Sequence, residues 1–326
     1  MRPGTVVQGA LQYAWARVTG RATWTCATLL VTFRCDQHCG YCDFPRHAGA
    51  ELDTAAWIRL IRGLRRAGTV RLGLSGGEPL LRPDLGQLVH AATSEGFVTS
   101  LVTNGSRLVE RLDDVLAVDY LLTTIEGDPR QHDAVRGAGA WNAAWSGIEA
   151  ARRRGGPRLG LICPVHAGNA ATLDEALRTA EALGVKVYYQ PVLQRSGWTG
   201  PGYPDLPADA IVHDAFQRIA AWKRSGRAVG NSTAYLSLVL ERRTGSLAGT
   251  CTAGRFFVTI LPDGRVTPCC MLPFGDHLPV VDSDAPHRAV EKVPRPVCGG
   301  CAIAPYVESH LILSMNARAL QTALRW

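Results

Sequence analysis

Three cysteines follow one predicted strand within eight residues, and their spacing constrains the fold of this 326-residue chain more than any other feature. Cys35, Cys39 and Cys42 form the pattern C-x3-C-x2-C in the segment VTFRCDQHCGYCDF. Three thiolates on one loop can ligate three irons of a [4Fe–4S] cluster and leave the fourth iron open to another ligand. A zinc site completed by His38 or His47 is the alternative, although structural zinc prefers four protein ligands.

A strand-like apolar run followed by an amphipathic helical stretch recurs about every 30 residues. The predicted strands are 24–33, 70–75, 97–103, 119–125, 158–164 and 185–191. The predicted helices between them are 53–67, 83–95, 138–154 and 172–183. This alternation is typical of parallel βα units. Because no Rossmann glycine fingerprint follows the first strand, the sequence favours an α/β fold with a partial (β/α)6 TIM-like barrel.

The rest of the chain predicts an N-terminal helix and a small C-terminal domain. A helix over 5–18 is expected to cap the bottom of the barrel with its apolar side. A Gly- and Pro-rich loop at 196–207 precedes helices at 208–225 and 232–243. Pro262-Asp263-Gly264 then predicts a hairpin turn, and a single helix over 306–325 follows. We therefore expect domains over 1–22, 23–245 and 246–326.

The C-terminal domain carries a second group of cysteines. Cys251, Cys269, Cys298 and Cys301 supply four thiolates, which is enough to enclose a second cluster completely. Cys270 is a possible substitute for its neighbour Cys269. Structural zinc bound by the same four thiolates is the alternative interpretation.

Composition restricts the compartment and the partners. No run of 18 apolar residues and no signal peptide is visible, which predicts a cytoplasmic chain whose ten cysteines stay reduced. Grouped cysteines in such a chain favour metal binding or catalysis over disulfides. The net charge is +7, but basic residues form no block and do not alternate with aromatic ones. We therefore expect neither nucleic acid nor a membrane as a partner.

Taken together, these motifs resemble the radical SAM superfamily. The C-x3-C-x2-C motif follows the first strand, Tyr41 precedes its last cysteine, and Gly76-Gly77-Glu78-Pro79 follows the second strand. The resemblance implies that the open iron is chelated by S-adenosylmethionine (SAM). Reductive cleavage of SAM would then give a 5′-deoxyadenosyl radical that abstracts a hydrogen from the substrate. It also implies an electron donor such as flavodoxin or ferredoxin.

The resemblance extends to residues at the ends of later strands. Glycines let the backbone come close, and Glu78 would pair with the SAM amino group. Thr124 and Glu126 stand where the family commonly has Ser and Asp, which leaves the ribose or carboxylate contacts open. Arg136 matches an arginine that reaches the SAM carboxylate in relatives. The adenine site is expected at 162–165 and 190–192. The expected SAM contacts are Tyr41, Gly76, Gly77, Glu78, Asn104, Thr124, Arg136 and Gln190.

Two further expectations follow from this resemblance. The tail is similar to the short auxiliary-cluster domain called twitch, which implies a second [4Fe–4S] cluster; the cysteines of the longer SPASM tail are missing. Cys163, late in the fifth strand, is a candidate hydrogen-atom donor, with a buried core thiol as the alternative. His166 and His213 are interpreted as loop or surface residues.

The substrate is the least constrained part of the prediction. Only residues 1–22 precede the first strand, and this favours a small molecule of natural-product biosynthesis over a peptide held by a recognition module. Dehydrogenation, epimerisation, dehydration, decarboxylation and sulfur insertion all remain open. One alternative is an enzyme that modifies ribosomal peptides. Another is a non-catalytic iron–sulfur electron-transfer protein or a structural zinc protein.

Overall fold

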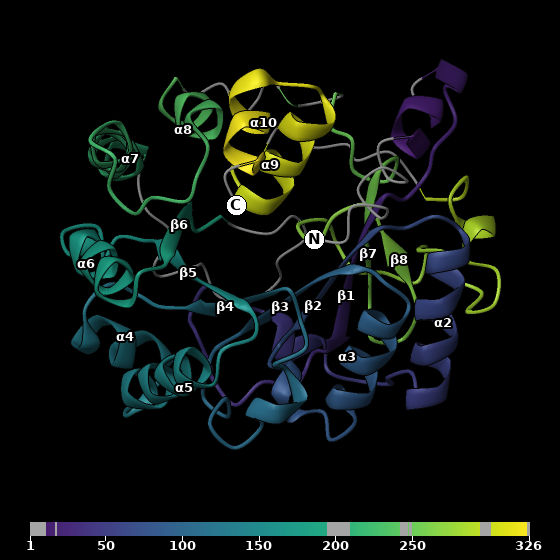
Figure 1. Cartoon of the computed structure of the whole chain (residues 1–326), viewed down its shortest axis with the longest axis horizontal. Helices are drawn as coiled ribbons and strands as arrows, with labels where there is room; N and C mark the ends of the chain where they lie inside the picture. The colour runs from purple at the N-terminus through teal and green to yellow at the C-terminus, as the bar shows by residue number, and fades with distance from the viewer. Residues whose placement is uncertain are drawn as a thin grey trace.

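Eight strands form one curved sheet in the computed structural model, in the order β6-β5-β4-β3-β2-β1-β7-β8 (Figure 1). The structure describes residues 11–16, 18–193, 209–241, 247, 250–293 and 301–324. Strands β1 to β6 are parallel and confirm the six predicted strands. Their bounds are Cys26–Thr32, Arg71–Gly76, Val98–Thr103, Tyr120–Thr124, Arg158–Val165 and Lys186–Pro191.

Helices line the outer side of this sheet (Figure 1). The predicted helices are present as α2 (Thr54–Arg66), α3 (Leu85–Ser94), α5 (Ala140–Arg154), α6 (Leu173–Leu183), α7 (Asp209–Arg224) and α8 (Thr233–Leu240). Helix α4 (Pro129–Arg136) was not predicted. Its sequence does carry a helix-start signal, because Asp128 caps the helix by accepting hydrogen bonds from the Arg130 and Gln131 amides. The partial barrel expected from the βα repeats is thus the observed architecture.

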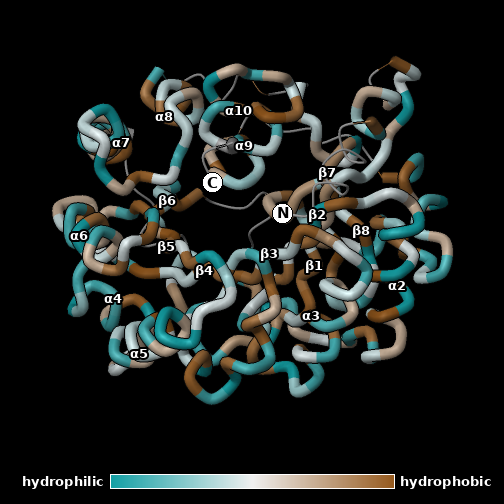
Figure 2. The backbone as a smooth tube through the Cα atoms, in the orientation of Figure 1, coloured by the Kyte–Doolittle hydropathy of each residue, from teal (hydrophilic) through white to brown (hydrophobic). Residues whose placement is uncertain are grey.

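The two faces of the sheet differ in burial. Alternate strand residues that point to the helices, such as Leu74, Leu101 and Leu121, are at most 1% exposed and belong to the main core. Figure 2 shows hydrophobic segments along the strands and hydrophilic positions on the outer turns. Residues of the opposite, concave face are only half-buried: Ser75, Ser100, Val102, Leu122, Thr124, Ile162, Tyr188 and Gln190.

The predicted hairpin is present and extends the barrel sheet. Strand β7 (Phe257–Ile260) pairs antiparallel with β8 (Val266–Thr267) around the predicted turn, where the Gly264 amide donates to the Leu261 carbonyl. On its other side β7 pairs in parallel with β1, in the register Cys26 to Phe257. The tail therefore supplies a second neighbour to the strand that leads into the first cysteine group.

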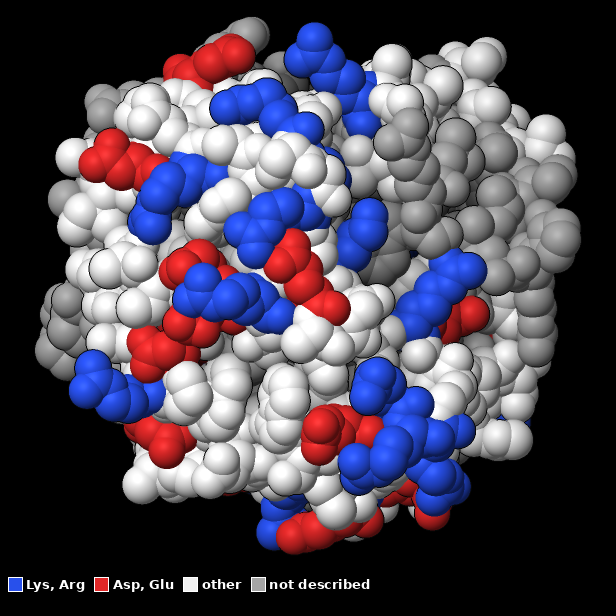
Figure 3. Space-filling view, turned by 60° about the vertical axis from the view of Figure 1, so that its left-hand side comes forward, with Lys and Arg blue, Asp and Glu red and all other residues white. Residues whose placement is uncertain are grey.

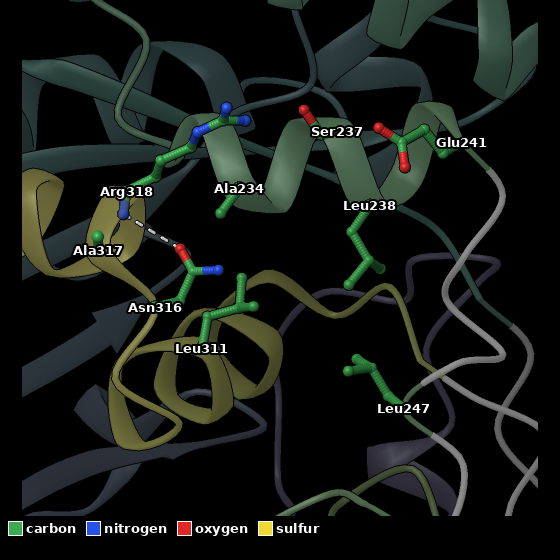
Figure 4. A pocket seen from close by; sticks show the side chains of 9 residues that line it. All are labelled: Ala234, Ser237, Leu238, Glu241, Leu247, Leu311, Asn316, Ala317 and Arg318. Atoms are coloured by element: carbon green, nitrogen blue, oxygen red, sulfur yellow. Dashed lines mark hydrogen bonds between the residues drawn. The ribbon is translucent and has the colours of Figure 1, made fainter.

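The prediction of a single helix over 306–325 is wrong, because the chain bends sharply within this segment. Helix α9 (Ala304–Leu313) ends before Met315, whose φ of 59° is left-handed, and α10 (Ala317–Leu324) begins after Asn316. The Asn316 side chain accepts hydrogen bonds from the Arg318 and Ala319 amides, the first of which is drawn in Figure 4. An N-cap of this kind starts a new helix.

The N-terminal helix docks with a different side from the predicted one. Ala16 is fully buried, and Tyr13 packs against Phe256 with ring centroids 5.0 Å apart. Leu11, on the apolar side expected to face the barrel, is 67% exposed, and Val18 is 88% exposed. Residues 5–10 of this helix, the predicted loop at 196–207 and most of the segment 245–249, at the expected domain boundary, lie outside the described residues. None of the described helices has the length and apolarity needed to cross a bilayer.

Candidate functional site

The first cysteine group lies on the loop that leaves the carboxyl end of β1. Cys35, Cys39 and Cys42 are half-buried, and the Cys42 amide donates to the Cys39 carbonyl at 3.0 Å. Burial raises the pKa of Cys35 to about 11 and that of Cys42 to about 12, so metal binding here would release protons. Within the described ranges, no three Cys, His, Asp or Glu side chains already converge as ligands. The donor set nevertheless fits three-iron ligation, because three thiols share one short loop and influence each other electrostatically.

Two glycines let the second strand end directly against this loop. A Cβ on Gly76, whose φ is +145°, would stand 2.2 Å from the Thr32 carbonyl oxygen, and one on Gly77 would stand 2.2 Å from that of Arg34. The amides in this turn are used as well, since Gly77 donates to Thr32 and Glu78 to Arg34, both at 2.8 Å. The glycines are therefore required here for the close approach of this turn to the Thr32 and Arg34 carbonyls.

The carboxylate of Glu78 is fully buried and holds the next strand end. Oε1 accepts from the Leu80 amide at 2.9 Å and from the Thr103 hydroxyl at 2.8 Å, and Oε2 accepts from the Asn104 amide at 2.7 Å. Burial raises the pKa of Glu78 to about 7 against the opposing effect of these donors. One acceptor position remains on Oε2 for a further partner.

Asn104 connects the third strand to the cysteine loop. Its side-chain nitrogen donates to Asp36 Oδ1 at 2.8 Å and lies 3.8 Å from the Cys35 sulfur. Ser106 reaches the same Asp36 with its hydroxyl at 2.7 Å. The structure thus brings the ends of β1, β2 and β3 together, as expected for chemistry at the carboxyl edge of a barrel.

A buried ion pair approaches the cysteine loop from the other side. Arg136 Nε donates to Glu126 Oε1 at 2.7 Å, and both side chains are nearly inaccessible. The guanidinium also donates to Gln37 Oε1 at 3.1 Å and to the Tyr41 hydroxyl at 2.8 Å, and Tyr41 in turn donates to Glu126. Burial alone would raise the pKa of Glu126, but Arg136, His166 and Tyr41 outweigh it and lower the pKa to about 2.

Sequence reasoning missed two members of this network. His166 is fully buried rather than a loop or surface residue, and its Nε2 lies 3.2 Å from Glu126 Oε2. Gln37, inside the cysteine motif, is 5% exposed and accepts from Arg136. The sequence marks Glu126 only as a departure from the family pattern, and no local signal indicates its contact with residues far away along the chain.

The remaining predicted SAM contacts and the candidate hydrogen donor lie on opposite faces of the sheet. Thr124 and Gln190 are half-buried on the concave face. Cys163 is 0% exposed and packs in the core cluster with Leu177 and Tyr189, on the side of the helices. The Cys163 side chain therefore points away from the face that carries Thr124 and Gln190. Asn169 lies beside it, with Nδ2 4.0 Å from the Cys163 sulfur and 3.2 Å from the Glu126 carbonyl oxygen.

Part of the second cysteine group gathers next to α9. Cys269 and Cys270 are adjacent at the end of the hairpin, and Cys301, before α9, is close enough to act electrostatically on Cys269. Tyr306 lies between this group and β7, with its hydroxyl 2.8 Å from Thr259 Oγ1 and 3.5 Å from the Cys270 amide. Cys251 is half-buried, and Cys298 lies outside the described residues.

Two other surface features lie apart from this site. Basic and acidic side chains lie interspersed over the face shown in Figure 3. Among the surface ion pairs of the described residues, Arg227 pairs with Glu181 at 2.7 Å. Figure 4 shows a cavity of about 490 Å³ among α8, α9 and α10. Its lining is partly apolar and includes none of the predicted site residues: Ala234, Ser237, Leu238, Glu241, Leu247, Leu311, Asn316, Ala317 and Arg318.

Comparisons with known proteins identify the family and the fold. Residues 29–180 match the radical SAM superfamily. Streptococcus suis SuiB bound to S-adenosylmethionine has a similar fold, with a TM-score of 0.65 and 14% identity over 83% of this chain and 66% of SuiB. SuiB bound to precursor peptide SuiA has a TM-score of 0.64 and 14% identity over 83% of this chain and 65% of SuiB. Native anSMEcpe with bound AdoMet and Cp18Cys peptide has a TM-score of 0.61 and 15% identity over 82% of this chain and 80% of anSMEcpe. The chain thus spans just under two thirds of SuiB.

Proposed function

We propose that this chain, a radical SAM enzyme by its matched domain and its barrel, modifies a ribosomally made peptide. The observation that carries the proposal is that two proteins of the same fold have been solved with peptides, SuiA on SuiB and Cp18Cys on anSMEcpe. These comparisons favour the peptide alternative over the small-molecule substrate expected from the short N-terminal segment. The half-buried, mixed polar and apolar concave face of the sheet is the surface that we assign to the substrate.

The residues at the carboxyl edge of the barrel fit SAM and its cluster. Cys35, Cys39 and Cys42 would hold three irons, and the bound cluster and SAM together supply a 5′-deoxyadenosyl radical. Glu78 would take the SAM amino group at the acceptor position left on Oε2, since its other positions hold protein donors. Thr124 and Gln190 would face SAM from the concave side of the sheet.

We further propose that the tail binds an auxiliary [4Fe–4S] cluster through Cys251, Cys269, Cys298 and Cys301. The nearness of Cys269, Cys270 and Cys301 supports this proposal, and Cys270 remains a candidate in place of Cys269. A flavodoxin or ferredoxin would supply the electron for SAM cleavage. We assign no step to Cys163, whose thiol lies in the helix-side core, and its role as a hydrogen donor stays a prediction.

The radical SAM assignment is tested with the full chain reconstituted anaerobically. We expect iron and sulfide for two clusters, and 5′-deoxyadenosine after reduction in the presence of SAM. Cys35→Ala should abolish 5′-deoxyadenosine while keeping the auxiliary iron, and Cys301→Ala should lose the auxiliary iron alone. Zinc in place of iron, or equal 5′-deoxyadenosine from the wild type and Cys35→Ala, would sink the assignment.

The substrate class is tested by hydrogen transfer, which can be followed before the substrate itself is identified. An extract of source cells grown in deuterated medium is divided by ultrafiltration into a peptide fraction and a small-molecule fraction. We expect deuterium to enter 5′-deoxyadenosine only with the peptide fraction, and protease treatment of that fraction should abolish the transfer. Deuterium transfer from the small-molecule fraction alone would instead support the substrate class first expected from the sequence.

A further inference from the structure

We propose that Arg136, oriented by Glu126, is a positioning residue that clamps the cysteine loop around Cys39, and that it is not the residue that binds the SAM carboxylate. The inference rests on the proposed binding of a cluster by Cys35, Cys39 and Cys42. It concerns a different question, namely what keeps that loop in shape.

The guanidinium of Arg136 contacts the loop on both sides of Cys39. Its Nη1 donates to Gln37 Oε1 at 3.1 Å, two residues before the cysteine. Its Nη2 donates to the Tyr41 hydroxyl at 2.8 Å, two residues after it. Because the guanidinium is planar and rigid, two bonds from one group fix the separation of Gln37 and Tyr41, and with it the turn that presents the Cys39 thiol.

Glu126 fixes the guanidinium in turn. Its Oε1 accepts from Arg136 Nε at 2.7 Å and from Tyr41, and its Oε2 lies 3.2 Å from His166 Nε2. Glu126 and His166 are fully buried, and Arg136 is 9% exposed, so these bonds form away from competing water. The network joins the ends of β4 and β5 to the loop after β1.

These bonds leave few N–H donors of Arg136 available to a ligand. The Nε and both Nη2 hydrogens are directed to Glu126 and Tyr41, and one Nη1 hydrogen is directed to Gln37. Only a single N–H remains, so a bidentate hold on a SAM carboxylate would require the network to open. This is the geometric reason for assigning Arg136 to the loop.

The experiment compares cluster retention with SAM affinity in the reconstituted full chain. Arg136→Lys keeps the charge but lacks the rigid planar fork that holds Gln37 and Tyr41 apart. Gln37→Met removes one loop contact without touching the buried ion pair. We expect both variants to lose iron to a chelator about 10-fold faster than the wild type, as read from cluster absorbance and from the EPR signal of the reduced cluster. The SAM dissociation constant of the loaded fraction should stay within about threefold.

A second set of variants distinguishes the proposed clamping of the cysteine loop from a general effect on the stability of the protein. Glu126→Gln alone leaves a buried guanidinium unpaired and should lower the melting temperature. The double variant Glu126→Gln/Arg136→Met removes both charges and should recover much of that loss, yet still release iron quickly. Arg178→Met, at an exposed arginine paired with Glu175 on α6, is the matched control and should retain iron like the wild type.

The possible outcomes keep the two proposals apart. Unchanged iron loss in Arg136→Lys and Gln37→Met, with or without weaker SAM binding, would overturn the clamp. An intact cluster with SAM affinity lowered about 10-fold in Arg136→Lys would restore the carboxylate-binding role. A wild type that takes up no iron would instead defeat the proposed function.

Discussion

Gly77 lies against Arg34, so close that a Cβ on the glycine would stand 2.2 Å from the Arg34 carbonyl oxygen. The same carbonyl accepts the Glu78 amide at 2.8 Å. Cys35 is the next residue along the chain, so the end of the second strand sets the backbone at the start of the cysteine loop.

Gly77→Ala should disturb this contact, because neither backbone can give way without breaking the hydrogen bond. We expect a loss of about 2 kcal/mol or more in the free energy of unfolding, measured in denaturant, together with lower iron content after reconstitution. Gly49→Ala is the control, since the nearest atom to its Cβ lies 3.9 Å away. Equal behaviour of the two variants would contradict the close-approach argument.

Glu78→Gln should destabilise the protein although it preserves size and shape. In either orientation the new amide nitrogen would meet a backbone N–H, that of Leu80 or that of Asn104, donor against donor inside the core. We expect a cost of about 1–3 kcal/mol in denaturant unfolding. Glu110→Gln, at an exposed position, should cost much less. A Glu78→Gln variant as stable as the wild type would mean that this carboxylate does not hold the Asn104 turn.

The buried His132 should make folding weaker in acid. Burial, together with the Arg136 charge, lowers the pKa of His132 from 6.5 to about 4. The folded state thus binds fewer protons than the unfolded state between these values, so stability is full above pH 6.5 and falls as the pH drops toward 4. The loss should reach about 3 kcal/mol.

Unfolding free energies from pH 7 to pH 4 check this dependence in the wild type and in His132→Gln. The glutamine can still accept the Glu126 amide, which donates to His132 Nδ1 at 3.3 Å. It does not titrate, so its stability curve should be flatter than that of the wild type in this window. Identical slopes, or an imidazole that titrates near pH 6.5 by NMR, would show that His132 is not held neutral.

Cys163→Ala should leave the reaction unchanged. The thiol is fully buried on the helix side of β5, so its removal should cost about 1 kcal/mol of stability through a small cavity. The yields of 5′-deoxyadenosine and of modified substrate should match those of the wild type. A variant that forms 5′-deoxyadenosine but no longer completes the product would reinstate this cysteine as a hydrogen donor.

Local patterns predicted most of the barrel. Each strand is a short apolar run, and the helices α2, α4 and α8 each begin with a side-chain cap; Asp53, for example, accepts the Ala56 amide at the start of α2. The break between α9 and α10 was missed, because apolar residues continue on both sides of it. The left-handed turn depends on Met315, a residue type that gives no turn signal.

The site was predictable only where the motif residues are neighbours in sequence. The cysteine loop and the glycine turn follow from local spacing. The contacts among Gln37, Glu126, Arg136 and His166 join the ends of three strands, and the carboxylate and imidazole meet only because β4 and β5 pair side by side. Strand alternation places Cys163 on the same face as Leu161 and Val165, which the sequence pattern alone could have indicated.

The pairing of β7 with β1 also has a consequence for the order of assembly in the cell. Strand β1 emerges first from the ribosome, and β2 can join it early, but its second neighbour arrives only after the whole barrel has been synthesised. Contacts between such distant segments form late, because closing the intervening loop costs entropy. The strand that leads into the first cysteine loop therefore has only one of its two neighbours until β7 has been synthesised.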